Sequence, residues 1–294
     1  MGKDSVKLKN REFWESGRKN YFQYSNYYKY FTEMALSRFG YENMPDEIDI
    51  RFMELILFSE GMCVFFKDEE IDRYLVTRVV PYGHLNEYNI PIKRRAYASN
   101  GYQRELTIDN SVIIYNNYLH TGDMYIIDDY ARRIWDIDRT IDVNAKAQKT
   151  PVLILAEDKE RMTLKNMYAQ YDGNQPVIYG KKSLDPASIT AINTGAPLVA
   201  PQLYELRTNL WNEALTHLGI ANIQFQKKER LITDEVKRGN GGVIASRNSP
   251  LNMREYGFAQ INKMFGLNII PYFKEDTYDS EEDEAQEKEM QNNE

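Results

Sequence analysis

The sequence predicts an α+β chain, mainly helical, from three patterns that follow one another along its 294 residues. Apolar side chains recur at helical spacing in residues 14–39 and 49–59, and again over the stretches 124–149 and 201–218. Between these two groups, residues 61–117 hold short runs rich in β-branched and aromatic side chains. With 42% hydrophobic residues the chain can bury a core, and its length suits one or two domains.

The first predicted helix carries an aromatic stripe and ends at Gly40. The stripe residues, mostly three, four or seven apart, are Trp14, Tyr21, Tyr24, Tyr28, Phe31 and Leu36. Helical spacing explains the stripe as a core-facing surface, with stacking on nucleic acid as the alternative. A second helix is expected from Asp49 to Ser59, with Gly61 as its C-terminal stop. Its inward side chains are expected to be Phe52, Leu55 and Ile56.

The β-rich stretch predicts a small barrel or sheet. Its candidate strands are 62–66, 73–80, a pair flanking Asn100-Gly101, and 111–115. Asn-Gly supplies the positive φ angles of a type I′ turn, so residues 95–106 are predicted to form a hairpin.

A long helix is expected over residues 124–149 and ends before Pro151. Its a/d-like seam consists of Ile127, Tyr130, Ile134, Ile137 and Ile141. The i,i+4 charge pairs on its other faces are Asp128/Arg132, Asp129/Arg133 and Arg132/Asp136.

A compact unit follows, with a strand at 152–156, a helix at 163–171, a turn at 172–174 and a strand at 177–179. The second long helix, 201–218, is capped by Gly219. The side chains on its apolar face are Leu203, Leu206, Leu210, Ala214 and Leu218. After an unstructured segment, a third helix is expected at 253–265 and a strand at 267–273.

A search for an active site is negative. The chain has one cysteine, Cys63, and three scattered histidines, so no zinc site, disulfide or cofactor is expected. It lacks a phosphate-binding GxxxxGK[ST] motif, and no apolar run approaches the ~20 residues that span a bilayer. The chain is therefore not expected to be an enzyme. The alternative is a metal-dependent nucleic-acid enzyme that uses Asp128, Asp136 and Asp138.

Charge is concentrated in two places. Residues 275–294 hold ten acids and one lysine, which predicts a disordered acidic tail. A basic cluster lies in residues 222–239, within a predicted loop that extends to residue 249. Its members are Lys227, Lys228, Arg230, Lys237 and Arg238. Such groups on a loop contact phosphates without reading bases, which also leaves open a monomeric DNA-binding adaptor.

Several long blocks resemble the portal protein, also called the head–tail connector or upper collar, of small tailed Bacillus phages of the phi29 type. The blocks are VNAKAQKTPVLI (143–154), LWNEALTHLGIANIQFQKKERLITDEV (210–236), SVIIYNN (111–117) and MTLKNMYAQYDGNQPVIY (162–179). Weaker similarity extends to about Met1 and to FGLN at 265–268.

The resemblance implies a portal fold with long stem helices, a β-rich SH3-like wing and a small α/β clip. The implied parts are a wing (1–117), a stem helix (118–150), the clip (151–198), a second stem helix (199–221), a channel loop (222–249), a wing or crown helix and strand (250–274) and the acidic tail (275–294). The basic cluster falls in the channel loop.

By the same resemblance, twelve copies form a ring at one capsid vertex of the virion, assembled in the host cytoplasm. The ring is the channel for packaging and ejecting double-stranded genomic DNA. The implied partners are the major capsid and scaffolding proteins, the lower collar or tail protein, and a packaging ATPase, with or without a packaging RNA. No membrane is involved.

The sequence departs from the best-studied relatives at two places. The positions aligned with their two channel lysines look to be Asn193 and Gln202, so lysine rings do not carry over. The basic residues at the N-terminus are more diffuse than in relatives, where that end contacts packaging RNA, and an RNA or capsid contact is the hypothesis here. These residues are Lys3, Lys7, Lys9, Arg11, Arg18 and Lys19.

Overall fold

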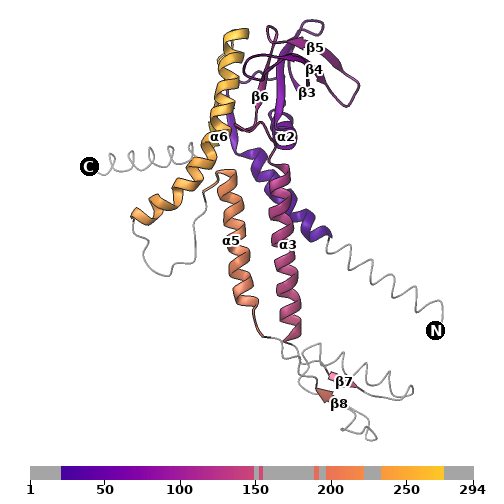
Figure 1. The fold of residues 1–294 in the computed structure, drawn as a ribbon, viewed down its shortest axis with the longest axis vertical. Coiled ribbons are helices and arrows are strands. Elements are labelled where there is room, and N and C mark those ends of the chain that lie inside the picture. Colours follow the sequence, from indigo (N-terminus) through magenta and orange to yellow (C-terminus); the bar gives the residue numbers. More distant parts are fainter. Residues whose placement is uncertain (1–20, 149–151, 155–188, 192–196, 222–232, 275–294) are drawn as a thin grey trace, which may run out of the picture. The chain divides into compact units, whose positions relative to one another are not determined.

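The computed structural model describes residues 21–148, 152–154, 189–191, 197–221 and 233–274 (Figure 1). The chain divides into two units. Unit 1 contains residues 1–135 and 208–294, and unit 2 contains residues 136–207. The described parts combine helices with antiparallel sheets, which confirms the predicted α+β class. Among the described helices, none is long and apolar enough to cross a membrane.

Unit 1 contains a five-stranded antiparallel sheet in the order β5-β4-β3-β2-β6. Its strands are β2 (Met62–Asp68), β3 (Arg73–Leu85), β4 (Pro91–Tyr97), β5 (Gln103–Thr107) and β6 (Ser111–Tyr115). Every predicted strand of this region is therefore confirmed. The register places Val64 opposite both Thr77 of β3 and Ile113 of β6.

The sheet curls toward a barrel, because its two edge strands are joined by only residues 108–110. Four strand spacings would separate β5 from β6 by about 19 Å in a flat sheet, whereas four extended residues span at most about 14 Å. Across the curl, Val64 and Phe66 of β2 share a buried cluster with Ala96 of β4 and Leu106 of β5. The small barrel predicted from the strand pattern is consistent with this curl.

The hairpin between β4 and β5 is present, but its turn is not type I′. Gly101 has φ +87°, whereas Asn100 is not among the residues of positive φ, and a type I′ turn needs both. The Gly101 N–H donates to the Ala98 carbonyl at 3.1 Å, and the Ala98 N–H donates to Tyr102 at 3.0 Å. A type I turn followed by a left-handed glycine fits this pattern.

Helix α2 (Ile50–Glu60) confirms the second predicted helix and its C-terminal stop. The Asp49 carboxylate accepts from the Phe52 N–H, and Gly61 ends the helix with φ +82°. The inward face is shifted from the predicted one, since Phe52 and Leu55 are half-buried. The buried side chains of α2 are Met53, Glu54, Ile56, Leu57 and Phe58.

The helix that contains residues 21–37 ends before Gly40, which lies in strand β1 (Phe39–Glu42) and so does not stop the helix as expected. Strand β1 pairs antiparallel with β9 (Ile270–Phe273), with Gly40 opposite Tyr272. A Cβ at Gly40 would lie 2.3 Å from the Tyr272 ring. Glycine is therefore required there by the close approach of an aromatic side chain.

The main core of unit 1 lies where the helices cover the outer side of β2 and β6. Cys63 and Phe65 of β2 and Ile114 of β6 are buried there against α2 and α6 (Thr233–Phe265). The Cys63 thiol is fully buried, which raises its pKa and makes it a poor nucleophile. The aromatic stripe is also mainly a packing surface, since Phe31 is fully buried against Trp211 at 4.7 Å between ring centroids.

The long helices α3 (Met124–Ala147) and α5 (Ala200–Leu218) confirm the two predicted long helices. Of the α3 seam, Ile127 and Ile134 are fully buried. On α5 the face is buried at Leu210, Ala214 and Leu218, whereas Leu206 is exposed.

Helix α5 ends in a Schellman motif. The Ile220 N–H donates to the Leu215 carbonyl and the Gly219 N–H to the Thr216 carbonyl, both at 3.0 Å. Gly219 has the positive φ of +73° that this cap needs.

Helix α6 contradicts the loop expected up to residue 249, because it begins at Thr233. Tertiary packing outweighs the poor helix propensity of its glycines. A Cβ at Gly242 would lie 3.6 Å from Thr216 of α5, and the neighbouring Val243 is buried. Pro250 lies inside the helix, and Figure 1 shows that α6 is bent, as expected where a proline removes a backbone donor.

In unit 2, Asn144 joins the end of α3 to the start of α5. Its side chain accepts from the Val199 and Ala200 N–H groups at 3.0 and 3.1 Å and donates to the Pro197 carbonyl at 2.8 Å. Strand β7 (Val152–Ile154) pairs antiparallel with β8 (Ile189–Ala191). The predicted helix at 163–171, the turn at 172–174 and the strand at 177–179 lie outside the described residues.

Candidate nucleic-acid interface

The predicted DNA-contacting residues divide between a described helix and undescribed segments. Lys237 and Arg238 belong to the first turns of α6, whereas Lys227, Lys228 and Arg230 lie outside the described residues. Asn193 also lies outside them, and Gln202 is exposed on α5. The N-terminal candidates Lys3, Lys7, Lys9, Arg11, Arg18 and Lys19 precede the described part of the chain. Of the proposed contact residues, the structure therefore describes only Lys237 and Arg238, which share one helix.

The structure does show what holds α6. Arg247 lies against the end of α5, where its Nε donates to the Gly219 carbonyl at 3.1 Å. Its guanidinium carbon is 4.0 Å from the centroid of the Phe273 ring in β9, a cation–π distance. A Cβ at Gly219 would lie 2.9 Å from the Arg247 Cα. The glycine cap of α5 thus also permits the backbones of α5 and α6 to approach.

The C-terminal half of α6 is anchored by Arg254, which is fully buried. Its Nη2 donates to Glu54 Oε2 at 2.7 Å, its Nε donates to Glu54 Oε1 at 3.0 Å, and its Nη1 donates to the carbonyls of Asn116 and Pro250. The Tyr41 hydroxyl donates to the same Glu54 carboxylate. Burial alone would lower the pKa of Arg254, but the charge of Glu54 raises it above its ordinary value. Arg254 therefore stays charged in the core.

A second buried arginine, Arg38, joins the ends of three helices. It follows the helix of residues 21–37, and its Nη1 donates to the Leu218 carbonyl at the end of α5 at 3.0 Å. Its Nη2 donates to Asp123 at 2.7 Å. The Asp123 carbonyl accepts the first backbone bond of α3, from Ile127, at 3.0 Å. Burial lowers the pKa of Arg38, and the charge of Asp123 offsets part of that effect.

These arginines are the residues that the sequence reasoning missed. Arg254 lies within the apolar stripe of Met253, Phe258 and Ile261. A charge at such a position indicates a buried ion pair. Glu54 is the corresponding charge on the apolar face of α2, and it indicates the acidic partner of such a pair. Both networks are framework contacts, because the Arg254 network ties α6 to α2 and the Arg38 network joins the ends of three helices.

Two of the three aspartates of the metal-enzyme alternative, Asp128 and Asp138, are engaged with other side chains. The Asp128 carboxylate accepts from Arg132 and from the Tyr24 hydroxyl. Asp138 lies 2.8 Å from the Nε of Arg207. Across the described residues, no group of three His, Cys, Asp or Glu side chains could hold a metal ion. The observed geometry therefore gives no support to metal catalysis by these three aspartates.

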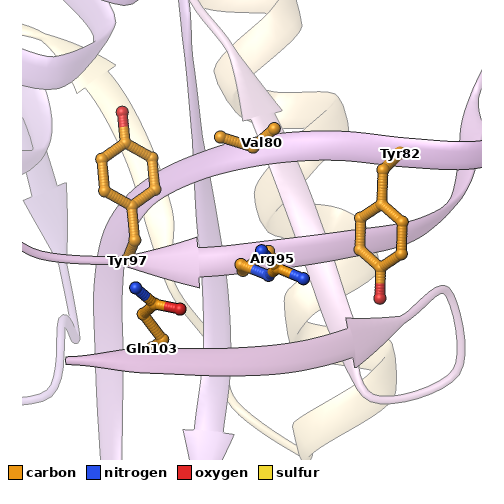
Figure 2. A pocket seen from close by; sticks show the side chains of 5 residues that line it. All are labelled: Val80, Tyr82, Arg95, Tyr97 and Gln103. Carbon is orange, nitrogen blue, oxygen red and sulfur yellow. The ribbon is translucent and has the colours of Figure 1, made fainter. Parts of the chain in front are cut away.

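The curled sheet presents a shallow groove of about 380 Å³ on strands β3, β4 and β5, shown in Figure 2. Tyr82 and Tyr97 stand at its two ends, with Val80 and Arg95 between them. The Arg95 side chain already has two partners within the sheet. Its Nε donates to Glu105 at 2.6 Å, and its guanidinium lies 5.6 Å from the Tyr82 ring centroid. The groove carries no arrangement of acid, base and nucleophile.

Three solved structures share similarity over most of this chain. The portal and tail of native bacteriophage P68 match with 16% identity and a TM-score of 0.47, over 93% of this chain and 96% of that one. A portal protein of the HK97 family from Corynebacterium diphtheriae matches with 9% identity and a TM-score of 0.40, over 83% and 88%. The virion of a native gene transfer agent matches with 10% identity and a TM-score of 0.40, over 84% and 79%.

The decisive comparison is with a family of sequences, because the structural similarities are loose. Residues 7–277 match the family described as Phage Connector (GP10). This match covers all the elements described above, including α6 with its buried Arg254. The protein therefore belongs to the phage connector family and is a portal protein of the virion, located at the capsid vertex where DNA is packaged and ejected.

Proposed function

We propose that this chain acts as a closed ring of twelve copies whose central channel passes double-stranded DNA in both directions. Membership of the connector family supports an oligomeric ring that contacts capsid and tail proteins. The finer partners, a packaging ATPase and a packaging RNA, belong to the proposal. So does the absence of catalysis, since the chain is proposed to hydrolyse nothing and to leave the chemical work to the motor.

The observation that carries the ring is the apolar surface that the long helices leave uncovered. On α3, Tyr125 is 77% exposed, and Ile126 beside it is also exposed. On α5, Tyr204 and Leu206, two residues apart in unit 2, are both exposed. Exposed apolar groups on helices favour contact with another protein surface. A head-to-tail contact that closes by rotation produces a ring.

Within this proposal, the long helices are the stem, the curled sheet is the wing, and the segment with β7 and β8 is the clip. The proposed DNA contact is the basic run that ends at Lys237 and Arg238. Five cations within twelve residues support electrostatic attraction to phosphates. Because α6 begins at Thr233, the proposed loop is shortened to residues 222–232, and the last two cations lie on the helix.

DNA binding by the assembled protein tests the contact. Replacing Lys227, Lys228, Arg230, Lys237 and Arg238 by Gln should lower DNA affinity and flatten its dependence on salt, equally for unrelated sequences. Unchanged binding would place the contact elsewhere, and sequence-specific binding would contradict a channel that must pass any sequence. The matched control replaces the exposed cations Arg73 and Lys93 of the sheet by Gln and should leave affinity unchanged.

A further inference from the structure

Unit 1 has an apolar groove at the point where the described chain ends. The groove has a volume of about 510 Å³ and lies between the helix of residues 21–37, the start of α2 and Lys274. Its apolar lining comes from Tyr28, Leu36, Phe39 and Ile50. No catalytic or metal-binding group is present among these residues.

The rim of this groove is basic. Lys29, Arg51 and Lys274 line it, against one carboxylate, Glu33. Lys29 is exposed, and Arg51 reaches only the exposed Asp49, at 3.9 Å. Exposed pairs of that length contribute little, so the rim keeps positive charge available for an anionic segment.

The last described residue, Lys274, is held at this groove. The Lys274 N–H donates to the Arg38 carbonyl at 3.0 Å, one residue beyond the β1–β9 ladder. Lys274 itself lines the groove. The residues that follow are Glu275, Asp276, Thr277 and Tyr278, and Tyr278 is the only aromatic residue of the acidic tail. Four extended residues reach about 14 Å.

We propose that residues 275–278 dock into this groove of their own subunit. The Tyr278 ring covers the apolar lining beside Phe39 and Leu36, and Glu275 and Asp276 face Lys29 and Arg51. An aromatic ring supplies the buried area, and opposite charges set the orientation. The docked segment fixes the root of the tail on unit 1, so that the acids from Asp279 onward project from a defined place.

Hydrogen exchange on the full-length assembled protein tests the docking. The amides of residues 276–279 should exchange about tenfold or more slower than in an unstructured peptide. Tyr278→Ala should abolish this protection, and Lys29→Glu combined with Arg51→Glu should weaken it. Arg73→Glu, an exposed charge reversal on β3, is the control and should leave it unchanged. Unprotected amides in the wild type, or protection that survives Tyr278→Ala, would overturn the proposal.

A disulfide test separates a subunit's own groove from that of a neighbour. Thr32→Cys with Thr277→Cys keeps Tyr278 in place, and the buried Cys63 is a poor competitor. Mild oxidation should give a bond within one chain, seen as a faster single-chain band on a non-reducing gel. Chain-to-chain dimers would overturn the assignment to the same subunit. A disulfide yield no higher than that of an Asn26→Cys/Thr277→Cys control would overturn the docking itself.

Discussion

Arg254 and Glu54 form a two-point ion pair in the core, with Nη2–Oε2 at 2.7 Å and Nε–Oε1 at 3.0 Å, and their side chains are 0% and 2% exposed. The pair ties the C-terminal half of α6 to α2. Both oxygens and all the guanidinium nitrogens have partners. Removal of either residue therefore leaves an uncompensated buried charge.

Arg254→Met should lower the free energy of unfolding by about 3–5 kcal/mol, as breaking one side of a buried pair does. Chemical denaturation measures the loss. Arg95→Met, which removes the half-exposed pair with Glu105, is the matched control and should cost less than about 1 kcal/mol. In the double variant Arg254→Met/Glu54→Leu, the loss should be smaller than the sum of the single losses. Additive losses would contradict the coupling.

The hydrogen bonds of Asp68 in the sheet should make part of the folding stability sensitive to acid. Its carboxylate accepts from the Tyr102 hydroxyl, the Glu70 N–H and the Arg104 Nε, and the bond from Tyr102 is the main cause that lowers its pKa from 3.8. Below pH 3.8 the unfolded chain takes up a proton while the folded chain stays ionised. Stability from Asp68 is therefore present above pH 3.8 and is lost as the pH falls through its folded pKa.

Asp68→Asn should consequently reduce the loss of stability between pH 6 and pH 3, while lowering stability at pH 6. Denaturation midpoints at several pH values measure both effects. Asp46→Asn changes an exposed carboxylate outside these hydrogen bonds and should keep the full acid dependence. An Asp68→Asn protein with an unchanged pH profile would show that this carboxylate titrates alike in both states.

Two glycines should respond in opposite directions to alanine. A Cβ at Gly122, at the start of α3, would lie 2.5 Å from the Phe58 carbonyl oxygen and 2.7 Å from that of Ser59. Since backbone must move, Gly122→Ala should cost about 1–3 kcal/mol. Gly241 has open space around its Cβ position and lies inside α6, so Gly241→Ala should stabilise by about 0.5–1 kcal/mol. A destabilising Gly241→Ala would contradict the helix at this position.

Local sequence signals predicted most of the described elements. Gly61 and Gly219 correctly marked the ends of α2 and α5, because C-terminal caps are local hydrogen-bonding devices. The seven-residue spacing of isoleucines gave α3. The turn at Asn100-Gly101 was misassigned because its type depends on the φ of Asn100, which the sequence pair does not determine.

The errors at Gly40 and in α6 have a different cause. Gly40 is required because the Tyr272 ring lies against it, and Gly242 is tolerated within a helix because α6 packs against Thr216 there. Both partners lie far along the chain. The buried arginines are of the same kind, since Arg38 and Arg254 form hydrogen bonds with groups 85 to 213 residues away. A charge within an apolar stripe indicates a buried ion pair, but it does not identify the distant partner. The proposed DNA-contacting cluster rests on sequence, since three of its five residues lie outside the described part.

Assembly is the central claim, and the mass of the purified protein in solution tests it most directly. Native mass spectrometry with negative-stain microscopy should give a closed ring with a central hole and about twelve times the mass of the 34.5 kDa chain. Closed rings of another copy number would change the stoichiometry but keep the channel. A stable 34.5 kDa monomer at micromolar concentration, with no rings in the micrographs, would contradict the account.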